Sequence, residues 1–187
     1  MKKEQIPNVL TIGRILFIPL FIFILTLDHS QGSHLLAAII FSVASITDYL
    51  DGYLARSRNE VTTFGKFLDP IADKLAVVVA LFVLLEWHMV SPWVLLVIVA
   101  REFLVSGLRM VVASKGVVIA ASDLGKWKTA TTMVAICGLL FLPSIPGGMI
   151  QDVLLFIFNT SMWVAVVLTA WSGIDYFVKS WQYIAEV

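Results

Sequence analysis

The chain has 187 residues, of which 59% are hydrophobic and only 14% are charged. Soluble domains carry about 25% charged residues, so this composition favours a protein that crosses a membrane several times over a soluble enzyme. The formal net charge is zero and the sequence has no basic tail, which gives nucleic-acid binding no support.

Apolar stretches separated by turn-forming residues predict six membrane-spanning helices, at about 8–27, 34–56, 68–87, 91–113, 124–142 and 150–178. Each is long enough to cross a hydrocarbon core of about 30 Å at 1.5 Å per residue. The first span resembles a signal peptide, but the residues after it form a poor cleavage site, so we expect it to be retained. Without repeats or linkers, residues 1–187 are expected to form a single domain, an all-α integral membrane protein.

Basic residues are distributed unequally between the two sets of connections. The connections at 28–33, 87–92 and 143–148 contain no lysine or arginine. The opposite side carries Lys2, Lys3, Arg56, Arg58, Lys66, Lys115, Lys126, Lys128 and Lys179. Because basic loops stay in the cytoplasm, this asymmetry predicts a cytoplasmic N-terminus.

Polar residues gather in the cytoplasmic halves of the predicted spans, whereas the outer halves are almost purely apolar. The inner residues are Asn8, Thr11, Arg14, Asp48, Asp51, Asp69, Asp73, Arg109, Lys126 and Thr129, with Arg101 and Glu102 nearer the middle of the membrane. Polar groups at that depth must face protein or water rather than lipid. The sequence therefore predicts a polar cavity that faces the cytoplasm.

Four aspartates, Asp48, Asp51, Asp69 and Asp73, are the strongest functional signal. An ionisable residue inside a membrane helix costs roughly 2.5–3.5 kcal/mol on insertion scales and usually marks function. The first two are spaced i, i+3 and the last two i, i+4, so each pair shares one helix face. The two helices should run antiparallel, which allows the carboxylates to converge. Hard oxygen ligands suit Mg²⁺ or Mn²⁺, and two such ions would balance four negative charges.

Small residues and one arginine accompany these carboxylates. Gly52, Ala55 and Gly65 would let a bulky ligand approach the backbone. Arg56 has the planar fork that binds phosphate in a bidentate way. Together they favour a site for a phosphorylated ligand beside the metal ions.

Several of these residues also have purely structural interpretations. Asp69 followed by Pro70 is typical of a helix N-cap with proline at the first helical position. Gly52 and Gly65 could serve only helix packing, and Asp51 with Arg56 could form a structural pair.

Two further pairs contain charged residues. Lys126 and Lys128 could merely anchor a helix end at the lipid headgroups. Arg101 and Glu102 are neighbours that do not face each other on a helix, so each is expected to find a partner on another helix.

The run Asp48-x2-Asp51-Gly52-x2-Ala55-Arg56-x8-Gly65-x3-Asp69-x3-Asp73 resembles the signature of the CDP-alcohol phosphatidyltransferase family, without departure. Members transfer a phosphatidyl or related group from a CDP-linked donor to an alcohol and release CMP. They use two divalent cations and are typically dimers. The resemblance implies one metal on Asp48, Asp51 and Asp69 and another on Asp48, Asp69 and Asp73. It also implies that Asp73 is the base for the acceptor hydroxyl.

Four segments resemble bacterial members that use CDP-diacylglycerol and sn-glycerol 3-phosphate. These segments are Ile6-Pro7-Asn8-x2-Thr11-x2-Arg14-x4-Pro19, residues 64–74, Ala100-Arg-Glu-Phe-x4-Leu-Arg109 and residues 125–129. The resemblance implies a homodimer in the bacterial inner membrane with its active site in the cytoplasm. It implies a donor site at Asn8, Thr11, Asp51, Gly52, Ala55, Arg56 and Gly65, and an acceptor-phosphate site at Arg101, Arg109 and Lys126.

Other interpretations differ in acceptor or in class. Family members with another acceptor make cardiolipin, phosphatidylserine or phosphatidylinositol phosphate. A cation transporter would use the same acids as an ion site, but it should carry acids through both halves of the membrane. A non-enzymatic scaffold leaves the carboxylate cluster unexplained.

Overall fold

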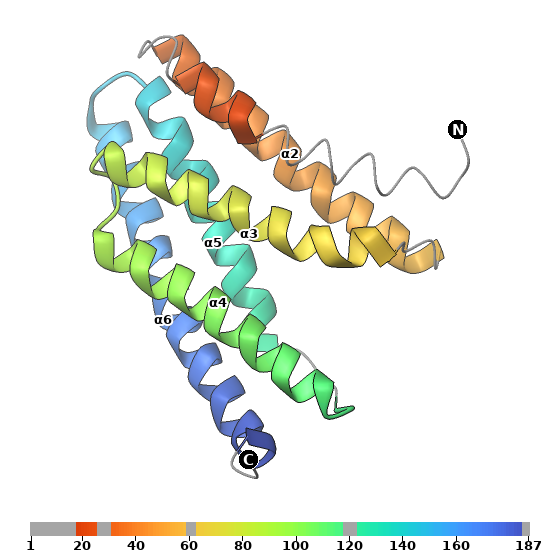
Figure 1. Ribbon diagram of the computed structural model, residues 1–187. Helices are drawn as coiled ribbons and strands as arrows, with labels where there is room; N and C mark the ends of the chain where they lie inside the picture. Colours follow the sequence, from red (N-terminus) through yellow and green to blue (C-terminus); the bar gives the residue numbers. More distant parts are fainter. Residues whose placement is uncertain (1–17, 26–30, 59–62, 118–122, 185–187) are drawn as a thin grey trace, which may run out of the picture. The chain divides into compact units, whose positions relative to one another are not determined.

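The computed structural model describes residues 18–25, 31–58, 63–117 and 123–184, although the side chains of residues 31, 48–58, 63–70, 72, 73, 123, 124, 126, 182 and 184 are not among those described. Residues 18–25 are helical, and the remaining elements are α2 (Gln31–Arg58), α3 (Thr63–Glu86), α4 (Pro92–Ser114), α5 (Asp123–Phe141), a 3₁₀ turn η2 (Leu142–Ser144) and α6 (Met149–Ile184) (Figure 1). No strand occurs in this part of the chain. The all-α prediction is confirmed.

The helices are longer than predicted at three places. α2 covers residues 31–58 rather than 34–56, α3 begins at Thr63 rather than 68, and α6 continues to Ile184 rather than 178. Asp69 therefore lies within α3, well after its first turn, and the interpretation of Asp69 as an N-cap is wrong. Pro70 is an interior proline, so it cannot donate to the carbonyl four residues earlier.

The start of α4 shows why its boundary was predictable. Ser91 has extended backbone angles (φ −76°, ψ 148°), and its hydroxyl accepts a bond from the Trp93 amide at 3.4 Å. Pro92 occupies the first helical position, where its missing N–H costs nothing. Such a Ser-Pro pair is a local signal that needs no tertiary contact.

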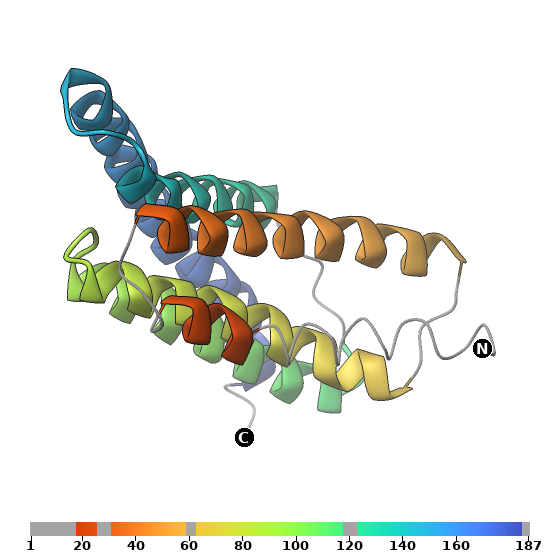
Figure 2. The same cartoon turned by 90° about the horizontal axis from the view of Figure 1, so that it is seen from above.

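Two compact units can be distinguished in the chain. Unit 1 comprises residues 1–80 and 137–152, and unit 2 comprises residues 81–136 and 153–187. In unit 1, Phe21 packs its ring against Phe41 of α2, with centroids 5.7 Å apart, and α2 also packs against η2. Figure 2 shows α2 and the first part of α3 running in opposite directions, as their short connection predicts.

The core of unit 2 contains apolar side chains from several helices. In α4 the buried residues are Val94, Ile98, Val105 and Val112, spaced by four or seven positions along one face. Buried partners elsewhere in the unit are Leu81, Leu84, Ala135, Ile136, Met162, Ala165, Val166 and Tyr176.

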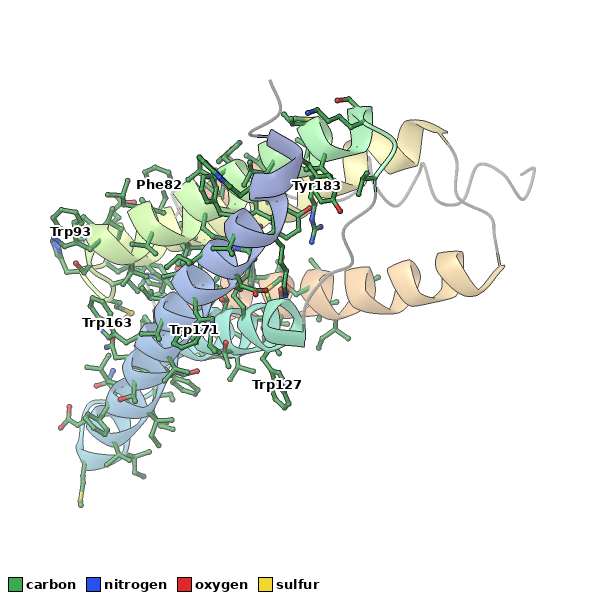
Figure 3. The ribbon with its side chains drawn as sticks, turned by 90° about the horizontal axis from the view of Figure 1, so that it is seen from below. Phe82, Trp93, Trp127, Trp163, Trp171 and Tyr183 are labelled. Carbon is green, nitrogen blue, oxygen red and sulfur yellow. The ribbon has the colours of Figure 1, made fainter. Side chains whose placement is uncertain are left out.

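Large apolar side chains cover the outside of unit 2. On α4 they are Trp93, Leu96, Phe103, Leu104 and Met110, and on α6 they are Phe156, Trp163, Val167, Trp171, Ile174 and Val178. Figure 3 shows Trp93, Trp127, Trp163 and Trp171 projecting away from the helices. Five polar residues are buried inside the same unit: Lys128, Thr132, Thr169, Ser172 and Ser180. Apolar groups outside and polar groups inside are the arrangement expected in lipid.

One described helix is long and apolar enough to cross a membrane, over Met149–Trp181, and Gly32–Thr47 is a shorter apolar segment. The first covers the predicted span 150–178 and extends beyond it at both ends, and the second overlaps the predicted span 34–56. The all-helical fold with this apolar helix is consistent with a membrane protein, and the count of six spans and the cavity remain predictions.

Candidate active site

The four aspartates lie on two helices of unit 1. Asp48 and Asp51 belong to α2, and Asp69 and Asp73 belong to α3. Because the helix is continuous through each pair, the spacings i, i+3 and i, i+4 place each pair on one face, as predicted. The side chains of these aspartates lie outside the described residues, so their convergence stays a prediction.

The predicted donor-binding residues lie close to the aspartates in sequence. Gly52, Ala55 and Arg56 follow Asp51 within α2, and Gly65 lies in the first turn of α3. Both glycines are thus helical rather than part of the connecting segment. The surroundings of these four residues are not described. Asn8 and Thr11, the two predicted residues of the N-terminal segment, also lie outside the described part of the chain.

The described side chains form no separate metal site. Among them, no group of three or more histidine, cysteine, aspartate or glutamate residues is placed to hold an ion. The donor chemistry of the four aspartates remains suited to divalent cations, because carboxylate oxygens are the ligands that Mg²⁺ and Mn²⁺ prefer.

A charged cluster joins α4, α5 and α6 in unit 2. Lys128 of α5 donates from Nζ to Oε1 of Glu102 on α4. Arg101 donates from Nη1 to the same carboxylate oxygen at 3.3 Å and from Nη2 to Oγ of Ser172 on α6 at 3.0 Å. Lys128 is only 7% exposed, and Ser172 is fully buried. One carboxylate oxygen therefore fixes two cations from different helices.

This cluster corrects two expectations. Arg101 and Glu102 do contact each other despite being sequence neighbours, because the two long side chains meet at the helix surface. The expectation that each also finds a partner on another helix is confirmed by Ser172 and Lys128. Lys128 is buried in an ion pair, so the interpretation that it only anchors a helix end is wrong.

Lys128 is one of the four cations on the predicted cytoplasmic half that could meet the acceptor phosphate, with Arg101, Arg109 and Lys126, and the structure buries it against Glu102. Its position has a signal in the sequence: Lys128, Thr132 and Ala135 follow the spacing of one helix face, and all three are buried. Trp127, its neighbour, is 67% exposed. The side chain of Lys126, which the sequence also predicts for the acceptor phosphate, lies outside the described residues.

Arg109 lies two turns along α4 from Arg101. Its guanidinium carbon lies 5.3 Å from the ring centroid of Tyr176 on α6, which is a cation–π distance. Arg101 and Lys128 thus share the carboxylate of Glu102, and Arg109 lies further along α4 against Tyr176.

The hydroxyls beside this cluster are not all satisfied. Ser172 donates to the Thr169 carbonyl at 3.1 Å, whereas Thr169 Oγ1 and Arg101 Nε are buried and have no hydrogen-bond partner among the described residues. Buried polar atoms without partners are uncommon in folded proteins. An excess of positive charge with an unused donor makes this cluster suited to an anion such as a phosphate.

The comparison with known proteins agrees with the sequence motif. A profile of the CDP-alcohol phosphatidyltransferase family matches residues 4–171. The chain is 43% identical to CDP-diacylglycerol--glycerol-3-phosphate 3-phosphatidyltransferase of Bacillus subtilis, over 95% of this chain and 96% of that protein. The proteins of the same name are 43% identical in Rickettsia typhi, over 93% of this chain and 96% of the relative, and 42% identical in Shigella flexneri, over 92% of both.

Proposed function

Since the chain belongs to the CDP-alcohol phosphatidyltransferase family, we propose that it transfers the phosphatidyl group of CDP-diacylglycerol to sn-glycerol 3-phosphate. The reaction releases CMP and forms phosphatidylglycerophosphate, a step of phospholipid biosynthesis. The observation that carries the proposal is the near full-length similarity to relatives that bear the name of this activity. The cationic cluster supports it independently, because the acceptor is an anion.

The donor half of the reaction is assigned to α2 and α3. Asp48, Asp51 and Asp69 would hold one divalent cation, and Asp48, Asp69 and Asp73 the other. When bound, Mg²⁺ or Mn²⁺ would offset the charge of the donor's pyrophosphate and of departing CMP. The cytidine and pyrophosphate are assigned to Asn8, Thr11, Asp51, Gly52, Ala55, Arg56 and Gly65.

The acceptor half is assigned to the charged cluster. Arg101, Arg109 and Lys128, together with Lys126, would bind the phosphate of sn-glycerol 3-phosphate and leave its primary hydroxyl free to react. Asp73 would take the proton from that hydroxyl as its oxygen attacks the lipid-side phosphorus. The P–O bond to CMP breaks, and the new ester is the product.

The setting belongs to the same proposal. The protein would be a homodimer in a bacterial inner membrane, with six spans and a polar cavity that faces the cytoplasm. The acyl chains of the donor would stay in lipid. The exposed apolar side chains of α4 and α6 support the membrane setting, and the distribution of lysine and arginine supports the orientation.

A CMP-release assay tests the reaction. Purified protein receives CDP-diacylglycerol and Mg²⁺ or Mn²⁺, and glycerol 3-phosphate, serine, inositol phosphate or phosphatidylglycerol is added separately. We expect glycerol 3-phosphate to be the only one of the four acceptors that gives CMP release. Chelation of the metal should abolish this release, and adding the metal back should restore it. Release with another acceptor would keep the family and reassign the acceptor, and no release with glycerol 3-phosphate would overturn the proposal.

An aspartate variant tests the base within the same assay. Asp73→Asn should fold normally but lose turnover by about 10²-fold or more, because an amide cannot accept the hydroxyl proton. Near-normal turnover of the folded variant would show that Asp73 is not the base.

A further inference from the structure

The guanidinium of Arg101 is fixed by groups on two helices. Nη1 bonds the Glu102 carboxylate at 3.3 Å, and Nη2 bonds the Ser172 hydroxyl of α6 at 3.0 Å. Nε is buried and has no partner among the described residues. An arginine held at both terminal nitrogens, with its Nε–H unused, is already oriented before a ligand arrives.

Gly173 lies beneath this side chain, next to Ser172 on α6. A Cβ at position 173 would come within 3.0 Å of Arg101 Cγ and 3.8 Å of Nε. Such an approach is too close for an ordinary carbon contact, so Arg101 would have to shift. The absence of a side chain at Gly173 is therefore what lets Arg101 lie directly across α6.

Gly107, a glycine of α4, provides a contrast. Gly107 has no atom within 4 Å of where a Cβ would be placed. Alanine at position 107 therefore fits without moving a neighbour, and it improves the local helix propensity. Of these two positions, only 173 brings the added methyl group against a residue of the charged cluster.

We propose that Gly173 is a positioning residue for the acceptor. It acts through Arg101: because Gly173 has no side chain, the guanidinium can occupy the position in which it bonds Glu102 and Ser172. The inference rests on the proposed function, in which Arg101 binds the phosphate of sn-glycerol 3-phosphate. A planar guanidinium binds phosphate through a fixed fork, so a displacement of a few tenths of an ångström weakens binding of the acceptor but not of the donor.

The experiment compares Gly173→Ala with Gly107→Ala by steady-state kinetics of CMP release. For Gly173→Ala we expect KM for glycerol 3-phosphate to rise about five- to twentyfold, with kcat and KM for CDP-diacylglycerol changed less than about twofold. Gly107→Ala should stay within about twofold of the wild type in all three constants. A merely structural role for Gly173 would not separate the two substrates in this way.

A double variant shows whether Gly173 acts through Arg101. Arg101→Ala removes the Cγ and Nε atoms that the new methyl group crowds, so adding Gly173→Ala to it should leave KM for glycerol 3-phosphate unchanged. The double variant can be measured even if Gly173→Ala by itself is unstable, because the Arg101 atoms that the new methyl group would crowd are absent from it.

Two failures can be told apart. A wild-type protein without glycerol-3-phosphate-dependent CMP release would overturn the proposed function and this inference with it. Equal kinetics of Gly173→Ala and Gly107→Ala in an active protein would overturn this inference alone. So would a further rise of KM when Gly173→Ala is added to Arg101→Ala.

Discussion

Lys128 and Glu102 show how a charged pair is accommodated inside a helical unit. The lysine side chain is 9% exposed and the glutamate side chain 21% exposed. Taking two charges out of water is costly, and their attraction repays this only when the remaining polar atoms are also bonded. Here the carboxylate oxygen receives both Lys128 and Arg101. The pair is therefore most sensitive to the loss of one partner.

Single and double substitutions test that dependence. Lys128→Met and Glu102→Gln should each lower the free energy of unfolding by about 1–3 kcal/mol, because the first takes one of two cations from the Glu102 carboxylate and the second leaves Lys128 without the carboxylate that it bonds. The double variant should cost at least about 0.5 kcal/mol less than the sum of the two. The measurement is reversible unfolding in mixed micelles.

An exposed pair provides the control for this cycle. Lys179 bonds Asp175 at 2.8 Å on the surface of α6, and its side chain is 55% exposed. Lys179→Met should change the free energy of unfolding by less than about 1 kcal/mol, because solvent screens such pairs. If the changes in the free energy of unfolding caused by Lys128→Met and Glu102→Gln are simply additive in the double variant, the ion pair does not contribute to stability as described.

At the scale of the element, serine and threonine hydroxyls in the apolar helices of unit 2 donate hydrogen bonds to backbone carbonyls of the same helix. Thr132 donates to the Lys128 carbonyl at 2.8 Å, Ser180 to the Tyr176 carbonyl at 2.7 Å and Thr160 to the Phe156 carbonyl at 2.7 Å, all four residues earlier. A hydroxyl satisfied within its own helix does not need a partner elsewhere. Polar residues can thus occupy a helix without specifying its neighbour.

The N-terminus of α4 offers an element-scale test. Ser91→Ala should lower the free energy of unfolding by about 0.5–1 kcal/mol, because the Trp93 amide loses its capping acceptor. Ser91→Asn, which also caps, should restore stability. Ser114→Ala is the matched control, since its hydroxyl is exposed and bonds only the Val111 carbonyl. Thermal unfolding in detergent compares the three, and equal melting of Ser91→Ala and Ser114→Ala would show that the cap contributes nothing.

For the whole molecule, the two ends of the predicted spans differ in their chemistry. Lys115 follows α4 on the predicted cytoplasmic side, and its Nζ bonds the Tyr183 carbonyl near the end of α6 at 2.5 Å. The turn between η2 and α6 contains Pro146, Gly147 and Gly148 and no charge. A positive charge at one end and none at the other is the pattern that orients helices in a bacterial membrane.

Cysteine labelling tests this orientation. In a Cys137→Ala background, which removes the chain's single cysteine, Gly147→Cys should react with a membrane-impermeant maleimide in intact spheroplasts. Lys115→Cys should react only after the membrane is permeabilised. The reverse pattern would overturn the predicted orientation, and reaction of both in intact cells would overturn the location of Lys115 in the cytoplasm.

The sequence by itself determined the helices and the faces of the aspartate pairs, because helical periodicity and turn residues act over a few neighbouring positions. Ser91 and Pro92 predicted the start of α4 to within one residue. The predicted start of α3 was wrong, because Asp69 followed by Pro70 is a local pattern typical of a helix start. Only the tertiary structure decided the charged cluster. Lys128 finds Glu102 across 26 residues and Arg101 finds Ser172 across 71. Those partners, and the close approach at Gly173, depend on how α4, α5 and α6 pack, which no local pattern encodes.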